Sequence, residues 1–195
     1  MDYQNNIQDI LSKHPVIPVV SFEANDNPLE FAQYLLANNI HCIEVTLRTE
    51  EAISAVKAIK QSFGSSMAIG IGTVIHSKQI EELKELEVDF LVSPGTTEEL
   101  VFALKASHIP FITGVSSPSD IMQAINMGLK TLKFFPANLF GGMAALKTYA
   151  SVFKDVKFCP TGGISKQTYK DYLALDNVIA VGGSWMQQDF KENKI

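Results

Sequence analysis

Short apolar runs alternate with segments of helical periodicity along almost the whole chain. Eight runs, rich in Val, Ile and Phe and closed by Gly, Pro, Ser or Thr, have the pattern of buried strands. They begin at positions 15, 42, 68, 89, 110, 131, 156 and 177, at intervals of 21 to 27 residues. The segments between them, such as 28–39, 50–63, 78–87 and 97–107, repeat apolar residues at helical spacing. The pattern predicts a strict alternation of strand and helix.

Such alternation implies parallel strands that are connected by crossover helices. Eight units fit an α/β fold of the (β/α)8 type, a TIM barrel. The alternative is an open, doubly wound sheet, but that fold usually has fewer strands, and no GxGxxG follows the first strand here. No linker or low-complexity stretch divides the chain, so we expect residues 1–195 to form one barrel domain.

The two ends of the chain add to this picture. Residues 1–14 precede the first strand, and we expect them to form a helix that closes the bottom of the barrel. About a dozen residues follow the last strand, enough for a shortened helix of three turns at most. The outer surface of the last and first strands should therefore be thinly covered. Helix N-caps are expected at Asn27 before Pro28, and at Ser77, Thr97 and Ser165.

The bulk composition is that of a globular protein and excludes several function classes. Of the 195 residues, 46% are apolar and 19% are charged, so disorder is not expected. The net charge of −5 and the dispersed lysines give no basic surface for a nucleic acid or a membrane. The N-terminus lacks the features of a signal peptide, and no apolar run approaches the roughly 18 residues of a membrane span. We expect a cytoplasmic protein.

Cysteine and histidine usage gives no sign of a disulfide or a metal. Cys42 and Cys159 lie in separate strand-like runs, so we expect two buried free thiols. The four histidines are far apart and show no HxxxH spacing. A metal mechanism would have to gather its ligands from distant segments, and it stays the less favoured alternative.

Candidate chemistry appears when side-chain parity along the strands is considered. Glu44, Thr46 and Arg48 share one parity in their strand, and Lys133 shares one with Phe135. If these parities face inward, a carboxylate, a guanidinium and an amine meet at the C-terminal mouth of the barrel, where this fold places its chemistry.

Three interpretations of Lys133 compete. It is an outward, solvated lysine, or the structural partner of a buried acid, or a nucleophile whose apolar surroundings favour the neutral amine. A neutral amine forms a Schiff base with a ketone, and Glu44 would then carry protons. Cleavage of a carbon–carbon bond in a 2-keto acid is the reaction that this combination predicts.

Arg48 and two glycine pairs supply candidate binding groups. The chain has fifteen lysines and one arginine, so Arg48 indicates a need for a planar fork that grips a carboxylate. The alternative is that Arg48 pairs with Glu50 or Glu51 at a helix start. Gly-Gly pairs follow the seventh and eighth strands, where barrels commonly bind phosphate, although simple turn geometry also explains glycines.

With these residues identified, the chain resembles the family of 2-keto-3-deoxy-6-phosphogluconate (KDPG) and 4-hydroxy-2-oxoglutarate aldolases from "IPVV" to "GGSW". The matching motifs are "IEVTLRT", "GIGTV", "SPG", "KFFPA", "CPTGGIS" and "VGGSW". The resemblance implies that Lys133 forms the Schiff base and that Glu44 is the general acid and base. It also implies that Arg48 and Thr73 bind the pyruvate carboxylate. A TIM barrel, a homotrimer and the absence of a metal or organic cofactor are further implications.

The same resemblance assigns the rest of the pocket. Pro94 and Phe135 would line it. The residues expected to hold the phosphate are Thr161, Gly162, Gly163, Gly182, Gly183 and Ser184.

Three departures from the family pattern lead to further expectations. Ser21 stands where many members have an arginine after the first strand, so we expect a looser grip on phosphate. Ile71 replaces a smaller residue and shares the parity of Thr73, so we expect a tighter pocket floor. The chain stops short of the final helix that members usually have, which fits a natural truncation, a trimmed sequence, or a loss that the oligomer interface compensates.

The leading hypothesis is cleavage of KDPG to pyruvate and glyceraldehyde 3-phosphate in the Entner–Doudoroff pathway, by a Schiff base on Lys133. A rival with the same chemistry is cleavage of 4-hydroxy-2-oxoglutarate to pyruvate and glyoxylate, with oxaloacetate decarboxylation as a side activity. A phosphate-binding isomerase or synthase without an imine, and a non-catalytic binding barrel, are the alternatives from other classes.

Overall fold

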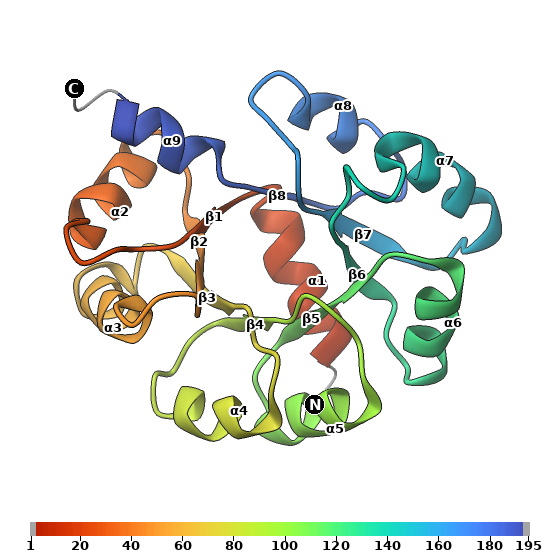
Figure 1. Cartoon of the computed structure of the whole chain (residues 1–195), viewed down its shortest axis with the longest axis horizontal. Coiled ribbons are helices and arrows are strands. Elements are labelled where there is room, and N and C mark those ends of the chain that lie inside the picture. The colour runs from red at the N-terminus through yellow and green to blue at the C-terminus, as the bar shows by residue number, and fades with distance from the viewer. Residues whose placement is uncertain (1–2, 193–195) are drawn as a thin grey trace.

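Eight parallel strands form a barrel in the computed structural model, which describes residues 3–192 (Figure 1). The strand order is β7-β6-β5-β4-β3-β2-β1-β8. Bridges between Phe158 and Val178 and between Thr161 and Gly182 bring the two ends of the sheet together. The predicted (β/α)8 barrel is thereby confirmed. The strands are β1 (Val16–Val20), β2 (Cys42–Thr46), β3 (Ala68–Gly72), β4 (Phe90–Val92), β5 (Phe111–Val115), β6 (Thr131–Phe134), β7 (Lys157–Pro160) and β8 (Val181–Gly183).

Helices surround the strands, and α1 lies across the barrel in the view of Figure 1. The segments that the sequence predicts as helical agree with the structure to within a few residues. The helices are α1 (Tyr3–Lys13), α2 (Pro28–Ala37), α3 (Ala52–Phe63), α4 (Ser77–Lys84), α5 (Glu98–Ser107), α6 (Pro118–Asn126), α7 (Gly142–Val152), α8 (Tyr169–Leu173) and α9 (Trp185–Glu192).

Two of the four predicted N-caps are confirmed. The Asn27 side chain accepts a hydrogen bond from the Glu30 amide, and Thr97 accepts one at the start of α5. Ser77 is instead the first helical residue of α4. Ser165 begins a turn that precedes α8 rather than the helix itself, because the chain reaches helical geometry only at Tyr169.

Inward and outward side chains of the strands form two separate cores. The outward residues, such as Ile43, Val45 and Leu132, pack against the helices. The inward residues at the bottom, such as Phe90, pack against Ile7 and Leu11 of α1. Full burial of an aliphatic side chain contributes about 1.5–3 kcal/mol, so α1 stabilises the closed bottom as predicted.

Both cysteines belong to this inner core and are free thiols, as expected. Burial raises the pKa of both thiols. The pKa of Cys159 rises to about 12 because burial outweighs the opposing influence of Lys133.

Ile71 does not narrow the pocket floor, and that expectation is wrong. The side chain is fully buried in the outer core between β3 and the helices. The inward positions of β3 are Gly70 and Gly72, beside Phe90 and Glu44. Ile71 and Thr73 do not share a side because Thr73 leaves the strand in a left-handed conformation (φ 65°), which breaks the alternation of side chains.

The C-terminal α9 has eight residues and lies beside α2 (Figure 1). A cleft of about 550 Å³ lies beside the start of β1, lined among others by Val16, Tyr34, Tyr169 and Trp185. All of β8 and the rest of β1 are nevertheless buried, so the thin cover expected over these strands is limited to Val16. Within residues 3–192, no helix combines the length and the apolar character that crossing a membrane requires.

Candidate active site

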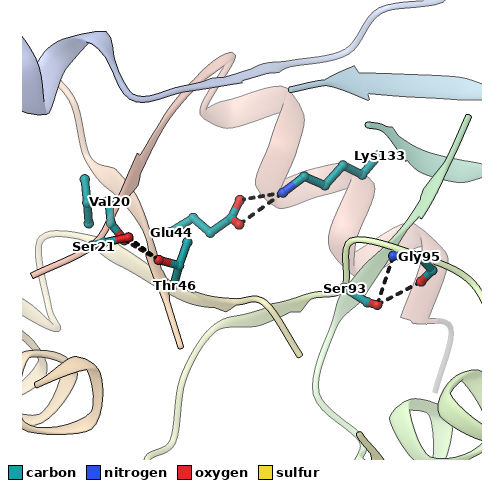
Figure 2. Close-up of polar contacts among 7 residues, drawn as sticks. All are labelled: Val20, Ser21, Glu44, Thr46, Ser93, Gly95 and Lys133. Atoms are coloured by element: carbon teal, nitrogen blue, oxygen red, sulfur yellow. Dashed lines mark hydrogen bonds and ion pairs between the residues drawn. The ribbon is translucent and has the colours of Figure 1, made fainter. Parts of the chain in front are cut away.

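A buried amine faces a buried carboxylate inside the barrel. Lys133 on β6 and Glu44 on β2 point toward one another across the interior (Figure 2). The Lys133 Nζ donates to Glu44 Oε1 at 3.1 Å and lies 3.5 Å from Oε2. Glu44 is only 4% exposed and Lys133 only 6%. The predicted convergence of the two side chains is confirmed, and the outward, solvated reading of Lys133 is excluded.

The interior position of Lys133 follows from the alternation of side chains along β6. Leu132 and Phe134 point outward, and Phe134 packs edge-on against Tyr149 and Phe158. Lys133 therefore points inward, where its Nζ lies 5.3 Å from the ring centre of Phe135. Lys133 is thus the partner of a buried acid, and its amine also lies where a nucleophile is expected. The structural and the nucleophilic interpretations of Lys133 therefore both hold.

The carboxylate of Glu44 has its place because β3 carries glycine opposite it. A Cβ at Gly72 would collide with the Glu44 carboxylate, and a Cβ at Gly70 would collide with the ring of Phe90. The "GIG" of the sequence is thus a requirement of close packing inside the barrel. Glycine provides the space in which the carboxylate reaches Lys133.

Thr73 follows directly after β3 and has a left-handed backbone with φ of 65°. This conformation is unusual for a β-branched residue and costs roughly 1–3 kcal/mol. Hydrogen bonds on both sides hold it, from Leu47 N–H to Gly72 O at 2.9 Å and from Val74 N–H to Val92 O at 3.1 Å. Strain of this kind at the barrel mouth is typical of a functional position.

A small cavity formed by Arg48, Phe135 and the loops after β7 and β8 gathers most of the predicted binding residues. Its volume is about 120 Å³, enough for a small anionic group. The cavity is lined by Val19, Arg48, Phe135, Thr161, Gly162, Gly163, Ile164, Gly183 and Ser184.

Arg48 does not form the surface ion pair that was its alternative role. Within residues 3–192, no ion pair joins Arg48 to Glu50 or Glu51.

The glycine loops of this cavity require glycine for two reasons. Gly162 and Gly163 have φ of +102° and +70°, and a Cβ at Gly163 would also collide with Asn138. The loop after β7 is not followed at once by a helix, because α8 begins only at Tyr169 and has five residues. Ser184, in contrast, immediately precedes α9, whose N-terminal end favours an anion.

Three predicted residues lie at the mouth without lining this small cavity. Pro94 follows β4, and its carbonyl packs so closely on β5 that Gly114 has no room for a Cβ. Thr73 follows β3. Gly182 lies on β8, where a Cβ would collide with the Thr161 side chain.

Sequence reasoning missed several neighbours of the site. Val19 and Ile164 line the cavity, and their only sequence signal was proximity to strand ends. Ser21 bonds to Thr46 at 2.6 Å, a contact that no local pattern announces (Figure 2). The hydroxyl of Thr161 is buried without a hydrogen-bond partner in the described chain, which leaves it able to bond a ligand.

In the part of the chain that the structure describes, no three His, Cys, Asp or Glu side chains are grouped to hold a metal ion.

A (β/α)8 barrel with a buried lysine and glutamate paired at its mouth has the arrangement of a Schiff-base aldolase. Comparison with known proteins agrees. Residues 7–194 match the family model "KDPG and KHG aldolase". The chain is 41% identical over 185 residues to the KHG/KDPG aldolase of Escherichia coli K12, covering 95% of this chain and 86% of the relative.

Solved structures give the same result. A KDPG aldolase from Legionella pneumophila, with pyruvate captured as a covalent carbinolamine, matches with a TM-score of 0.90 and 42% identity over 96% of this chain and 92% of its own. The Zymomonas mobilis aldolase with 3-phosphoglycerate has a TM-score of 0.89 and 37% identity, over 93% and 86%. The chain belongs to the KDPG and KHG aldolase family and is a carbon–carbon lyase.

Proposed function

We propose that this enzyme cleaves 2-keto-3-deoxy-6-phosphogluconate to pyruvate and glyceraldehyde 3-phosphate through a Schiff base on Lys133. The observation that carries the proposal is the buried contact of 3.1 Å between the Lys133 Nζ and the Glu44 carboxylate. At this distance Glu44 takes a proton from the ammonium directly and leaves an amine that attacks a ketone.

The first half of the reaction forms the imine. The Lys133 amine adds to C2 of the substrate, and Glu44 returns a proton to the former carbonyl oxygen, which gives a carbinolamine. Glu44 then takes a proton from the attached nitrogen and passes it to this hydroxyl, so that water leaves and a protonated imine remains. The positive nitrogen is now placed to accept electrons from the bond between C3 and C4.

The second half breaks that bond and restores the enzyme. Glu44 takes the proton of the C4 hydroxyl, the C3–C4 electron pair moves toward the imine nitrogen, and the aldehyde leaves. The remaining enamine takes this proton from Glu44 at C3. One water molecule then hydrolyses the imine to pyruvate and free Lys133, which replaces the water released in the first half. No metal or organic cofactor takes part in this sequence.

Groups on either side of the pair would hold the two ends of the substrate. Arg48 and Thr73 bind the carboxylate next to the ketone, while Pro94 and Phe135 line the pocket. The phosphate would lie at the N-terminal end of α9 and on the loops after β7 and β8. Its ligands would come from Thr161, Gly162, Gly163, Gly182, Gly183 and Ser184.

The relatives support both halves of this proposal. The Legionella aldolase was captured with pyruvate as a carbinolamine, which is the first covalent species in the scheme. The Zymomonas aldolase was solved with 3-phosphoglycerate, a phosphorylated three-carbon acid.

The second candidate substrate is 4-hydroxy-2-oxoglutarate, because the E. coli relative is named for both substrates and Ser21 supplies no cation for phosphate. The test of substrate choice compares kcat/KM for KDPG with kcat/KM for 4-hydroxy-2-oxoglutarate. We expect a clear preference for KDPG, since only this substrate has a phosphate for the binding groups near Ser184. Equal values would overturn the phosphate assignment.

The test of the imine is Lys133→Arg, which keeps the positive charge and removes the nucleophile. We expect kcat to fall by about 10⁴ or more, because covalent catalysis is lost altogether. Lys130→Arg is the matched control. Lys130 is exposed and lies three residues before Lys133, and this variant should keep full activity. Substantial activity in Lys133→Arg would indicate an isomerase or synthase that needs charge alone.

The proposal extends to the state of the enzyme in the cell. We propose that residues 1–195 act as one domain and that the enzyme is a homotrimer, supported by large exposed apolar side chains such as Phe102 (78%), Leu139 (73%) and Val152 (63%). A folded monomer in sedimentation at micromolar concentration would contradict the trimer.

The proposed location is the cytoplasm, in the Entner–Doudoroff pathway, because a charged sugar phosphate does not cross a bilayer unaided.

A further inference from the structure

We propose that Gln187 is a positioning residue for the proposed aldolase reaction: it clamps the first turn of α9 to the end of β1 and thereby fixes the two walls between which the anionic far end of the substrate binds. The inference rests on the proposed function, and it concerns a residue outside the pocket itself. Gln187 is half-buried and lies on the first turn of α9.

The clamp consists of two hydrogen bonds from one side-chain amide to one backbone residue. The Gln187 Nε2 donates to the Ser21 carbonyl oxygen at 2.7 Å, and the Ser21 backbone N–H donates to the Gln187 Oε1 at 3.3 Å. A carboxamide is the side-chain group that satisfies a backbone donor and acceptor together. The contact joins residues 166 positions apart in sequence.

Ser21 passes the restraint on to β2. Thr46 is fully buried, and its hydroxyl donates to the Val20 carbonyl oxygen at 2.9 Å. Its proton is therefore used, so Ser21 must be the donor in the 2.6 Å contact between the two hydroxyls (Figure 2). The end of β1 is in this way fixed against the strand that carries Glu44.

On the other side, the clamp fixes the start of α9. The Gln187 backbone N–H donates to the Ser184 carbonyl oxygen at 3.1 Å, so both residues belong to one rigid turn. Gly183 and Ser184 line the small cavity on this side, and Val19 and Arg48 line it on the side of β1 and β2. Gln187 joins these two sides without touching the cavity.

Holding α9 on the barrel does not depend on Gln187. Phe190 packs on Phe31 and Tyr34 with ring centres 5.2 and 5.1 Å apart, and Lys191 pairs with Asp26 at 2.8 Å. A variant without the clamp should therefore keep its helix and its fold. What changes is the precision with which the two walls face each other.

The experiment compares Gln187→Ala with Gln188→Ala, a neighbouring exposed glutamine on the same helix. We expect Gln187→Ala to raise the KM for KDPG about tenfold with kcat changed less than about twofold, because two hydrogen bonds outside the reacting centre are lost. Labelling by pyruvate and borohydride should stay at the wild-type level, because the wall that shifts carries Gly183 and Ser184, whereas Lys133, Glu44 and Arg48 belong to β6, to β2 and to the loop after β2. Gln188→Ala should match the wild type throughout.

A third variant, Gln187→Glu, tests the chemistry of the clamp. Its carboxylate accepts from the Ser21 N–H but repels the Ser21 carbonyl oxygen and adds negative charge near an anion site, so KM should rise further than in Gln187→Ala. Unchanged KM in Gln187→Ala, or an equal fall in kcat and in pyruvate labelling, overturns the inference. Failure of the wild type to cleave KDPG would instead overturn the proposed function, and this inference with it.

Discussion

Lys133 and Glu44 make each other's burial tolerable. An isolated charge inside the barrel would be strongly destabilising, whereas a hydrogen-bonded pair compensates much of the desolvation cost. Removal of one partner from such a pair typically costs 3–5 kcal/mol, because the other is left without compensation. The pair is thus a stability feature and, in the proposed mechanism, the source of both nucleophile and proton carrier.

Glu44→Gln separates these two contributions. We expect kcat for KDPG to fall by about 10²–10⁴, since the proton carrier is lost while the amine remains. We also expect the free energy of unfolding to fall by about 3 kcal/mol at most, because the carboxamide oxygen still accepts a hydrogen bond from Lys133. Steady-state kinetics and urea unfolding measure the two effects. Glu82→Gln, on the exposed face of α4, is the control and should change neither. A Glu44→Gln enzyme with wild-type kcat would remove Glu44 from the mechanism.

At the scale of elements, β3 matters through what it lacks. Its inward face presents Gly70 and Gly72, and the space above Gly72 is filled by the Glu44 carboxylate from the neighbouring strand. Glycine is a poor strand former, and two of the five residues of β3 are glycines. The stability of β3 therefore depends on the outward Ile69 and Ile71, which pack in the outer core.

Gly72→Ala tests this packing. The added methyl group must displace Glu44 from Lys133, so we expect kcat to fall by about 10²-fold and the free energy of unfolding by about 1–3 kcal/mol. Gly95→Ala is the matched control, because a Cβ at Gly95 meets no atom within 4 Å. Equal kinetics for the two variants would show that Glu44 does not need its present position.

The start of α6 carries a capping box whose strength depends on pH. The Asp120 carboxylate accepts hydrogen bonds from the Ser116 and Ser117 amides, both at 2.9 Å, and Ser117 accepts one from Asp120 N–H. Burial alone would raise the pKa of Asp120, but the hydrogen bonds from Ser116 and Ser117 outweigh it and hold the pKa below 3.8.

Asp120→Asn makes this contribution measurable. A folded-state pKa that is depressed stabilises the protein above the unfolded-state pKa, and the stabilisation is lost as the pH falls through the folded value. We expect the variant to lose about 0.5–2 kcal/mol of unfolding free energy at neutral pH. The difference from wild type should shrink as the pH falls below 3.8. Asp155→Asn, 84% exposed, is the control. A difference that is constant with pH would contradict the role of the charge.

At the scale of the whole molecule, the alternation of apolar runs was sufficient to predict the barrel and the helix that closes its bottom. Parity predicted that Lys133 and Glu44 would meet if they face inward, and the closed barrel shows that they do. Each of these depends on local periodicity and on the fixed geometry of parallel strands. The parity argument failed at Ile71 and the capping argument at Ser165, where the backbone leaves regular geometry at Thr73 and before α8.

Contacts between distant segments were beyond prediction for a different reason. The clamp of Gln187 on Ser21 and the pairing of Ser21 with Thr46 join parts of the chain that meet only when the barrel closes. The spacing between Lys133 and Glu44, 89 residues in sequence, likewise has no local signal for a direct ion pair. The sequence indicated which residues gather at the mouth, and the closed barrel determines which of them touch.

The Schiff base on Lys133 is tested by incubation with pyruvate and sodium borohydride, followed by intact mass measurement and peptide mapping. We expect a reduced pyruvyl adduct on Lys133 alone among the fifteen lysines, and none in Lys133→Arg. A folded protein that forms no adduct under conditions that label a control aldolase, or one labelled at another lysine, would contradict the Schiff-base mechanism proposed for this barrel.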